Sequence, residues 1–460
     1  MKRGLLLAAI GPIGLFVSSS PLVAATTAPA PAPLPEVKQW QLANGLNVFF
    51  LPEHKAPVVT AQVFYHAGSK DEPPTKRGIA HMFEHMMFKG SKHVPPEAHA
   101  RFVDAVGGSE NAFTADDLTC YHDTVPPSSL ELVIKLEAER MRNLLLTPKT
   151  INSEREVVKE EYRMRVEQSP VMKAFNQVLH LAYTVHPYKE LAVGEPRMLD
   201  TVTVADCRAF YDTWYRPNNA TLVVVGDTDE ATVRRLADTY FGPIERGPVV
   251  AHQTWNEPQQ TERKEATMKM PVRLPVVIGA YHIPAGASDD IYPLEVLQEI
   301  LSNGESSRLY RRLVHKDHSA VYAGGFVFAK EDPGLFIFYS VFLPSGDPAR
   351  VKAALADEVA RVTRDKVDAR ELEKAKNQLA ARAVAERERV AGIATRIGSD
   401  AIVNGDPLRQ FRAPARYDAV TADDVLRVAK TWFVDSAFSQ VTLVPEGGKG
   451  PAAATAGGAK

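Results

Sequence analysis

Two histidines and a glutamate stand close together near the start of the chain, in the segment HMFEH. His81 and His85 are four residues apart and Glu84 lies between them, so in a helix of 3.6 residues per turn the three side chains share one face. Two imidazoles at this spacing can bind one Zn²⁺ ion and leave the carboxylate beside the metal. The pentapeptide alone also occurs on ordinary packed or exposed helix faces, so a further ligand must be identified.

A charged helical stretch, SEREVVKEEYRMR, offers the missing ligand. Glu154 and Glu161 are seven residues apart and therefore lie on one helix face. Because catalytic zinc typically takes three protein ligands and keeps one position for water, we predict that Glu161 completes the site. Glu154, two turns away, is predicted to orient a ligand from outside the metal shell. Glu160 points about 100° away on the helix and is predicted to be solvated.

The rest of the chain must position these residues, and its pattern repeats. A polar, proline-punctuated segment at residues 242–267 divides the chain into two stretches of similar length. Each stretch alternates strands with long helices, for example helices at 76–88 and 128–146 and long helices within 349–403. The order predicts an α+β fold of two homologous α/β-sandwich domains, a pseudo-duplication. We place the domains at 37–245 and 268–445, joined by a linker at 246–267.

The two ends of the chain are unlike its middle. Residues 1–25 have a basic start, an apolar run and small residues before Ala25, which is typical of a cleaved signal peptide. An Ala/Pro linker at 26–36 follows, and residues 446–460 are predicted to form a disordered tail. A membrane anchor is the alternative, but the apolar run is shorter than the roughly 20 residues of a span. Export to a bacterial periplasm, as a protein without a membrane span, is the prediction.

Charge and cysteine content argue against nucleic-acid or membrane binding and against a cysteine metal site. Lys and Arg number 54 against 56 Asp and Glu, a net charge of -2, so no overall field favours nucleic acid or an anionic membrane. Cys120 and Cys207 are far apart in sequence and lack metal-ligand spacing. They are interpreted as unpaired or an incidental pair.

The motif and its flanks closely resemble a known enzyme family. The run GIAHMFEHMMFKGS, followed about seventy residues on by EREVVKEE, is similar to the inverted HxxEH signature of pitrilysin and insulinase-type zinc metallopeptidases. NAFTADDLTCY, WYRPNNATLVVVGD and LEKAKNQL extend the resemblance over nearly the whole mature chain, in the subgroup of mitochondrial processing peptidase and its bacterial relatives. The resemblance implies that His81, His85 and Glu161 hold one zinc ion per chain. Glu84 would act as the base that activates water.

One short segment resembles the family's strand beside the metal. It comprises Asn111, Ala112, Phe113 and Thr114. An exposed strand edge can add an extended peptide through backbone hydrogen bonds with little demand on sequence. We therefore predict substrate contact there, with an ordinary core strand as the alternative.

The second half departs from the family pattern. Active members carry an arginine and a tyrosine seven residues apart in a block resembling L-R-E-x-x-G-L-A-Y, and these residues help hold the substrate carbonyl. The matching block LVHKDHSAV places Val314 and Val321 at those positions. Tyr322 follows one position late, and on a strand a one-residue shift places the side chain on the opposite face. Arg311 and Arg312 align only if a gap is introduced.

These observations predict a zinc-dependent endopeptidase subunit acting on short or unfolded peptides. A homologous subunit that lacks the zinc motif would supply the missing arginine and tyrosine in a heterodimer. A self-sufficient monomeric or homodimeric peptidase is the first alternative. A non-catalytic assembly protein of the same fold is the second, and the retained Glu84 argues against it.

Overall fold

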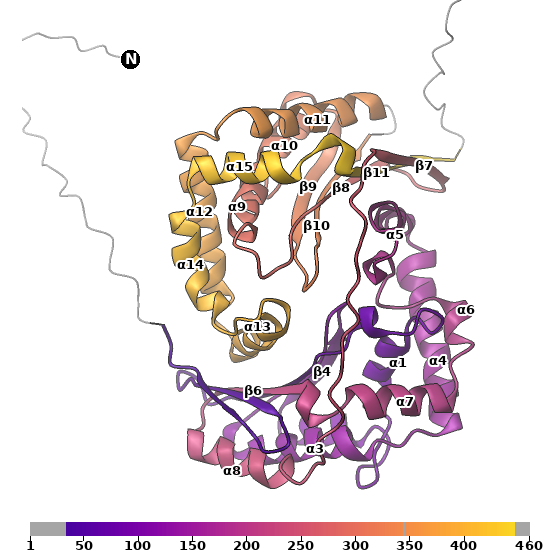
Figure 1. Ribbon diagram of the computed structural model, residues 1–460, viewed down its shortest axis with the longest axis vertical. Coiled ribbons are helices and arrows are strands. Elements are labelled where there is room, and N and C mark those ends of the chain that lie inside the picture. Colours follow the sequence, from indigo (N-terminus) through magenta and orange to yellow (C-terminus); the bar gives the residue numbers. More distant parts are fainter. Residues whose placement is uncertain (1–33, 344–345, 447–460) are drawn as a thin grey trace, which may run out of the picture. The chain divides into compact units, whose positions relative to one another are not determined.

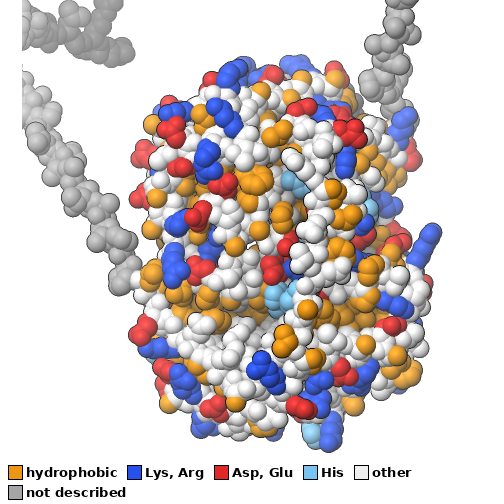
Figure 2. Space-filling model, in the orientation of Figure 1, with side chains coloured by type: hydrophobic (Ala, Val, Ile, Leu, Met, Phe, Trp, Pro, Cys, Tyr) orange, Lys and Arg blue, Asp and Glu red, His pale blue; other side chains and the backbone are white. Residues whose placement is uncertain are grey.

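The computed structural model describes residues 34–343 and 346–446. The predicted signal peptide at 1–25, most of the predicted Ala/Pro linker at 26–36 and nearly all of the predicted tail at 446–460 lie outside these residues. No helix within the described ranges is long and apolar enough to cross a membrane. On the face drawn in Figure 2, acidic and basic side chains are interspersed. Both cysteines are buried and neither forms a disulfide.

The first sheet has six strands in the order β1-β2-β6-β3-β5-β4. The strands are β1 Lys38–Gln41, β2 Asn47–Pro52, β3 Val59–Tyr65, β4 Ser109–Thr114, β5 Thr119–Val125 and β6 Ala220–Gly226. β2 runs parallel to β6, and the other neighbours are antiparallel. Every residue of β3 and β6 is buried, which agrees with the β-branched and aromatic residues that predominate in them.

The second sheet repeats this arrangement with five strands in the order β7-β11-β8-β10-β9. The strands are β7 Lys264–Met270, β8 Val276–His282, β9 Ala320–Phe328, β10 Leu335–Phe342 and β11 Phe438–Pro445. β7 is parallel to β11, and the other pairs are antiparallel. β4 and β9 are therefore equivalent outer strands. β7 begins inside the predicted linker of 246–267. Its residues alternate between half-buried and exposed, as those of an edge strand do, so this strand has no continuous apolar run that would mark it in the sequence.

The helices follow the strands in matching order (Figure 1). The first half contains α1 Ile79–Met86, α2 Ala98–Ala105, α3 Leu130–Asn143, α4 Pro148–Tyr162, α5 Pro170–Ala182, α6 Pro196–Leu199, α7 Val204–Trp214 and α8 Glu230–Tyr240. The second contains α9 Ile291–Leu301, α10 Arg308–Tyr310, α11 Pro348–Arg364, α12 Ala369–Ala385, α13 Val390–Val403, α14 Arg409–Ala419 and α15 Ala422–Trp432. α7 and α15 even begin with the same Thr-x-x-Asp capping box. The pseudo-duplication predicted from sequence is confirmed.

One helix of each half also packs against the sheet of the other half. Ile393 and Ile397 of α13 pack with Phe64 and Val223 of the first sheet, and α13 lies against that sheet in Figure 1. In the same way, α5 packs with β8 and β11 of the second sheet. Both faces of each sheet are thereby covered, one by helices of its own half and one by a helix of the other. Each half keeps a large hydrophobic core of its own, and two smaller buried clusters contain residues of both halves.

Candidate metal centre

His81, His85 and Glu161 are brought together by the packing of α1 against α4. One nitrogen or oxygen atom of each lies within 4.8 Å of the others. Glu161 Oε2 is 3.6 Å from His81 Nε2 and 3.3 Å from His85 Nε2. Donors bound to one zinc ion at about 2.1 Å in a tetrahedron lie roughly 3.4 Å apart. The three side chains therefore fit a zinc ion with two imidazoles and one carboxylate.

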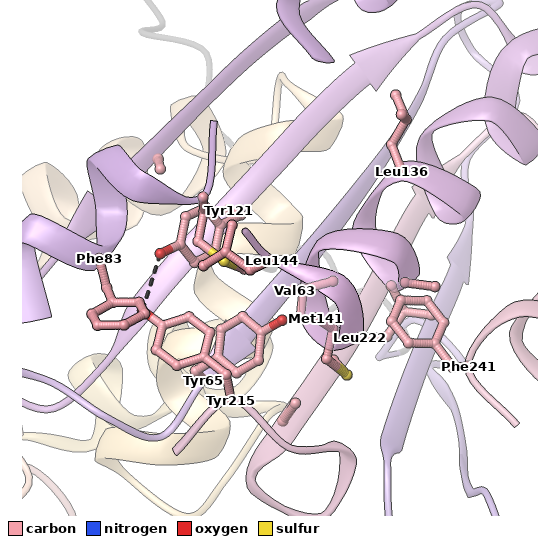
Figure 3. Packing of buried hydrophobic residues seen from close by; sticks show 14 of the residues in the cluster. Val63, Tyr65, Phe83, Tyr121, Leu136, Met141, Leu144, Tyr215, Leu222 and Phe241 are labelled. Carbon is pink, nitrogen blue, oxygen red and sulfur yellow. Dashed lines mark hydrogen bonds between the residues drawn. The ribbon is translucent and has the colours of Figure 1, made fainter. Parts of the chain in front are cut away.

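The helix that carries the histidines is anchored by Phe83. Its side chain is fully buried and lies in an aromatic cluster with Tyr65, Tyr121 and Tyr215 (Figure 3). The Phe83 ring is 5.3 Å from Tyr215, and the hydroxyls of Tyr215 and Tyr121 are 3.0 Å apart. Burying a phenylalanine on the opposite face of a two-turn helix fixes the rotation of α1, and therefore the direction of both imidazoles.

Glu72 closes the start of α1, a role that the sequence analysis missed. Its carboxylate is buried and accepts the backbone N–H groups of Gly78 at 2.9 Å and Ala80 at 2.8 Å. These are donors that the first turn of a helix leaves without partners. Gly78 has φ 97°, and a Cβ there would lie 2.9 Å from Gly194 Cα. A glycine is therefore required where two backbone segments meet beside His81.

The two histidines differ in their electrostatic environment. Burial lowers the pKa of His81 to about 4, so at neutral pH its imidazole is uncharged and keeps the lone pair that a metal requires. Burial also lowers the pKa of His85, but Glu154, Glu161 and Glu84 more than offset this, and the pKa is raised overall. A proton therefore competes with a metal ion at His85 up to a higher pH than at His81.

Glu154 and Glu161 are each held by a cation on the side away from the histidines. Glu154 Oε2 is 3.7 Å from His85 Nδ1, and its other oxygen is 3.3 Å from Lys89 Nζ. Glu161 Oε1 is 2.7 Å from Arg165, which leaves Oε2 directed at the histidines. The sequence analysis missed both cations, although an arginine four residues after Glu161 is a recognisable helix pair. Contacts of this kind orient ligands from outside the metal shell.

Of the two other glutamates considered from the sequence, Glu84 lies beside the candidate ligands and Glu160 points to solvent. Glu84 is on the same helix as the histidines but outside the three-ligand set. Burial raises its pKa, while Thr114 and His85 act to lower it. A carboxylate with a raised pKa beside a metal site is suited to accept a proton and release it again. Glu160 is exposed and pairs with Arg163 at 2.8 Å.

β4 forms the outer edge of the first sheet and packs against α1. Within the described chain it pairs with β5 alone, with Asn111 opposite His122 and Thr114 opposite Thr119. Ala112 is buried, Asn111 is exposed, and Phe113 and Thr114 are half-buried. An unpaired strand edge thus runs beside the helix of the two histidines.

The second-half block has a β-bulge that the sequence did not predict. Tyr322 pairs with Val341 and Ala320 pairs with Phe342, so Val321 is the extra residue. Ala320 packs in the helix-covered core, whereas Tyr322 stacks on Tyr339 on the other face, with ring centroids 5.6 Å apart. The expectation that a one-residue shift reverses the face of Tyr322 is wrong, because the bulge absorbs that shift. In a regular strand the residue that follows Ala320 points to the face opposite Ala320. Because of the bulge, Tyr322 points to that face.

The arginines near this block are engaged elsewhere. Arg308 and Arg311 bind Glu371 at 2.6 and 3.0 Å, and Arg312 binds Asp317 at 2.7 Å. Val314 lies in a π-helical turn, Arg311–Lys316. No arginine of this turn is free to take the predicted carbonyl-binding role.

Comparisons with known proteins identify the family. Residues 48–194 match the family model described as Insulinase (Peptidase family M16), and residues 201–379 match that described as Peptidase M16 inactive domain. The zinc protease PqqE of Helicobacter pylori is 30% identical over 420 residues, 90% of this chain and 94% of that protein. The chain belongs to peptidase family M16. All three candidate ligands lie in the part matched by the insulinase model.

Other M16 relatives agree in length and fold. The mitochondrial-processing peptidase subunit beta of Lentinula edodes is 25% identical over 412 residues, 86% of this chain and 88% of that protein. The crystal structure of a protease from Helicobacter pylori superposes with a TM-score of 0.86 at 29% identity, covering 90% of this chain and all of that one. An M16 inactive-domain structure from Pseudomonas fluorescens has a TM-score of 0.82 at 18% identity, covering 89% and 98% of the two chains. It shares the two-domain α+β fold.

Proposed function

We propose that the chain is a zinc-dependent endopeptidase in which His81, His85 and Glu161 hold one metal ion and Glu84 is the catalytic base. The observation that carries this proposal is the convergence of the three donor atoms within 4.8 Å on the two helices that also carry Glu84 and Glu154. A purely structural protein has no need for Glu84 beside this set. The non-catalytic assembly role is therefore the weaker reading.

The residues of the site divide the chemistry of peptide hydrolysis. Zinc, when bound, polarises the scissile carbonyl and makes water more acidic. Glu84 accepts the proton of the attacking water and delivers it to the leaving amine. Glu154 lies against His85 Nδ1 and would keep that ring in one orientation, and Arg165 pairs with Glu161 Oε1 while Oε2 faces the histidines. No covalent intermediate with the protein is required.

β4 is proposed to bind the substrate. Asn111, Ala112, Phe113 and Thr114 form the open edge beside α1, and a peptide added there would lie along the helix that carries the histidines. Backbone pairing selects extended segments rather than particular side chains, so short or unfolded peptides fit this edge and folded proteins do not.

We propose a homologous partner subunit for full activity. Val314 and Val321 cannot donate hydrogen bonds, and the nearby arginines are held in ion pairs. Losing one donor to a developing oxyanion costs on the order of a hundredfold or more in turnover. A partner that carries the arginine and tyrosine but lacks the zinc motif would restore both donors.

The bulge at Val321 supports a second candidate, a self-sufficient peptidase. Because Tyr322 takes the face expected of the family tyrosine and is about two-fifths exposed, it would replace one of the two missing donors. A monomer or homodimer would then retain partial activity.

One experiment separates the two candidates. The purified chain is sized and assayed on an unstructured peptide, alone and with the product of a neighbouring homologous gene, with zinc content measured in each sample. A large gain in turnover on forming a heterodimer supports the partner. Full activity of the lone chain, lost in Tyr322→Phe, supports self-sufficiency. No hydrolysis in either sample, despite bound zinc, would refute the peptidase proposal.

We also propose export to the periplasm, with cleavage after Ala25. Support comes from the composition of residues 1–25. Mass spectrometry of the N-terminus in a periplasmic fraction tests this, and an intact Met1 in the cytoplasmic fraction alone would contradict it.

A further inference from the structure

The internal repeat extends to the metal centre itself. α1 packs against α4 and β4, and α9 packs in the same way against α12 and β9. On α9, Glu295 and Glu299 have the four-residue spacing of His81 and His85, and Gln298 has the place of Glu84. The second half therefore contains a counterpart of the metal centre with different side chains.

The contacts support this equivalence. α4 begins after the cap Thr147 and α12 after the cap Asp368, which puts Arg382 at the position of Glu161. Arg382 binds Glu299 at 2.6 Å, as Glu161 approaches His85. An arginine on a carboxylate leaves no ligand set for a metal, so this counterpart is not a metal site.

A cavity of about 380 Å³ opens beside this counterpart. It is lined by α9, α12, α13, α14 and the outer strand β9, and four of the lining residues are arginines. Arg382 is paired with Glu299, and Arg396 with Glu386 at 2.9 Å. The volume is in the range of small-ligand and peptide-side-chain sites.

The other two arginines, Arg387 and Arg409, have no carboxylate partner among the described residues. Arg387 Nε is buried without a hydrogen-bond acceptor, which is costly for a charged donor, and the Arg387 guanidinium lies over Phe411 at 5.0 Å. Arg409 lies over Tyr292 at 4.4 Å. Arg387 Nη2 already donates to the carbonyl of Gln410. The remaining N–H groups of the two guanidinium groups are donors of the kind that bind a carboxylate.

Two carboxylates of the lining, those of Glu295 and Asp400, form no ion pair among the described residues. Glu295 accepts the Tyr417 hydroxyl at 2.6 Å, and Asp400 accepts the Asn404 amide at 2.8 Å, so both are bound to neutral donors. Burial raises the pKa of Glu295 and raises that of Asp400 to about 6, while the charge of Arg409 acts to lower both.

We propose that this cavity is a second, non-catalytic peptide-binding site, in which Arg387 and Arg409 take a carboxylate group of a peptide. It rests on the proposed function, because peptides are the proposed substrates and each hydrolysis creates a new C-terminal carboxylate. Phe326 and Phe328 of β9 line the same cavity and offer apolar contact to the residues next to that carboxylate. The backbone N–H of Val327 in β9 already donates to Gln298 at 2.7 Å and is not available to a peptide. The peptide would therefore be bound mainly through its carboxylate group and not through backbone pairing with β9.

The test measures binding to the metal-stripped full chain, so that the metal centre does not contribute. The probe is a fluorescent ten-residue unstructured peptide without acidic residues, with a free C-terminal carboxylate. Its C-terminal amide, and an amide carrying one internal glutamate, are compared by fluorescence anisotropy. The free carboxylate should bind about tenfold more tightly than the plain amide. The glutamate peptide shows whether a side-chain carboxylate serves equally.

Arg387→Gln and Arg409→Gln should each remove most of that preference, whereas the exposed Arg235→Gln of the first half should retain it. Arg387→Lys and Arg409→Lys keep the charge, and they replace the Gln variants if those melt at a lower temperature than the parent. Equal binding of acid and amide, or a preference that survives both arginine changes, would overturn the proposal. Because no hydrolysis is measured, a failure of the proposed peptidase activity would leave this result intact.

Discussion

Replacing Glu72 by alanine tests how α1, the helix that carries His81 and His85, is held in place. Its carboxylate accepts two buried N–H groups, of Gly78 at 2.9 Å and Ala80 at 2.8 Å. Each donor left buried without a partner costs about 1–3 kcal/mol. Because water can reach a helix end in part, we expect Glu72→Ala to lower the free energy of unfolding by about 2–4 kcal/mol. For a unit of this size that corresponds to a fall of roughly 2–5 °C in melting temperature.

Two further variants serve as a conservative substitution and as a surface control. Glu72→Gln keeps one carbonyl oxygen as acceptor and should lose about half as much stability. Glu230→Ala removes a carboxylate whose only ion pair among the described residues is with Arg234 at 2.7 Å, so it should change stability by under about 1 kcal/mol. Calorimetry of the three purified variants decides the matter. A Glu72→Ala protein that melts with the parent would refute the account of how α1 begins.

Three other predictions concern catalysis, acid stability and packing. Glu84→Gln should lower kcat by about 10²–10⁴-fold with zinc content unchanged, and near-normal turnover would place the base elsewhere. Burial raises the pKa of Glu331, but His66 and Lys70 lower it more, to about 2. Its stabilisation is therefore complete above about pH 4.5 and lost as the pH falls toward 2, and Glu331→Gln should flatten that part of an acid titration followed by circular dichroism. Ile397→Ala should cost about 2–5 kcal/mol in denaturant unfolding, whereas the exposed Val384→Ala should cost under about 0.5 kcal/mol; equal costs would contradict the exchange of helices between the halves.

The residues of the candidate metal centre could be named from the sequence because their signals are local. The spacing of His81 and His85 fixes a shared face within one helix, and Glu154 and Glu161 do the same on a second helix. That these two faces meet was implied by the family resemblance and not by spacing. The alternating strands likewise predicted two similar halves, since burial pattern is encoded along each strand.

The remaining features depend on contacts between distant segments. Glu72 lies in a loop before α1, and nothing in its neighbours marks it as the acceptor for that helix. The helix exchange places Ile397 against Phe64 across more than three hundred residues of chain. The bulge at Val321 arises from pairing with β10, and a strand read alone shows no register.

Zinc content of the purified full chain tests the central claim most directly. Elemental analysis should find one zinc ion per chain in the parent and in Glu84→Gln, because Glu84 is outside the ligand set. His85→Ala should lose most of its zinc, since two remaining ligands form a poor site. Zinc occupancy in His85→Ala equal to that of the parent would contradict the assignment of His81, His85 and Glu161 as the metal centre.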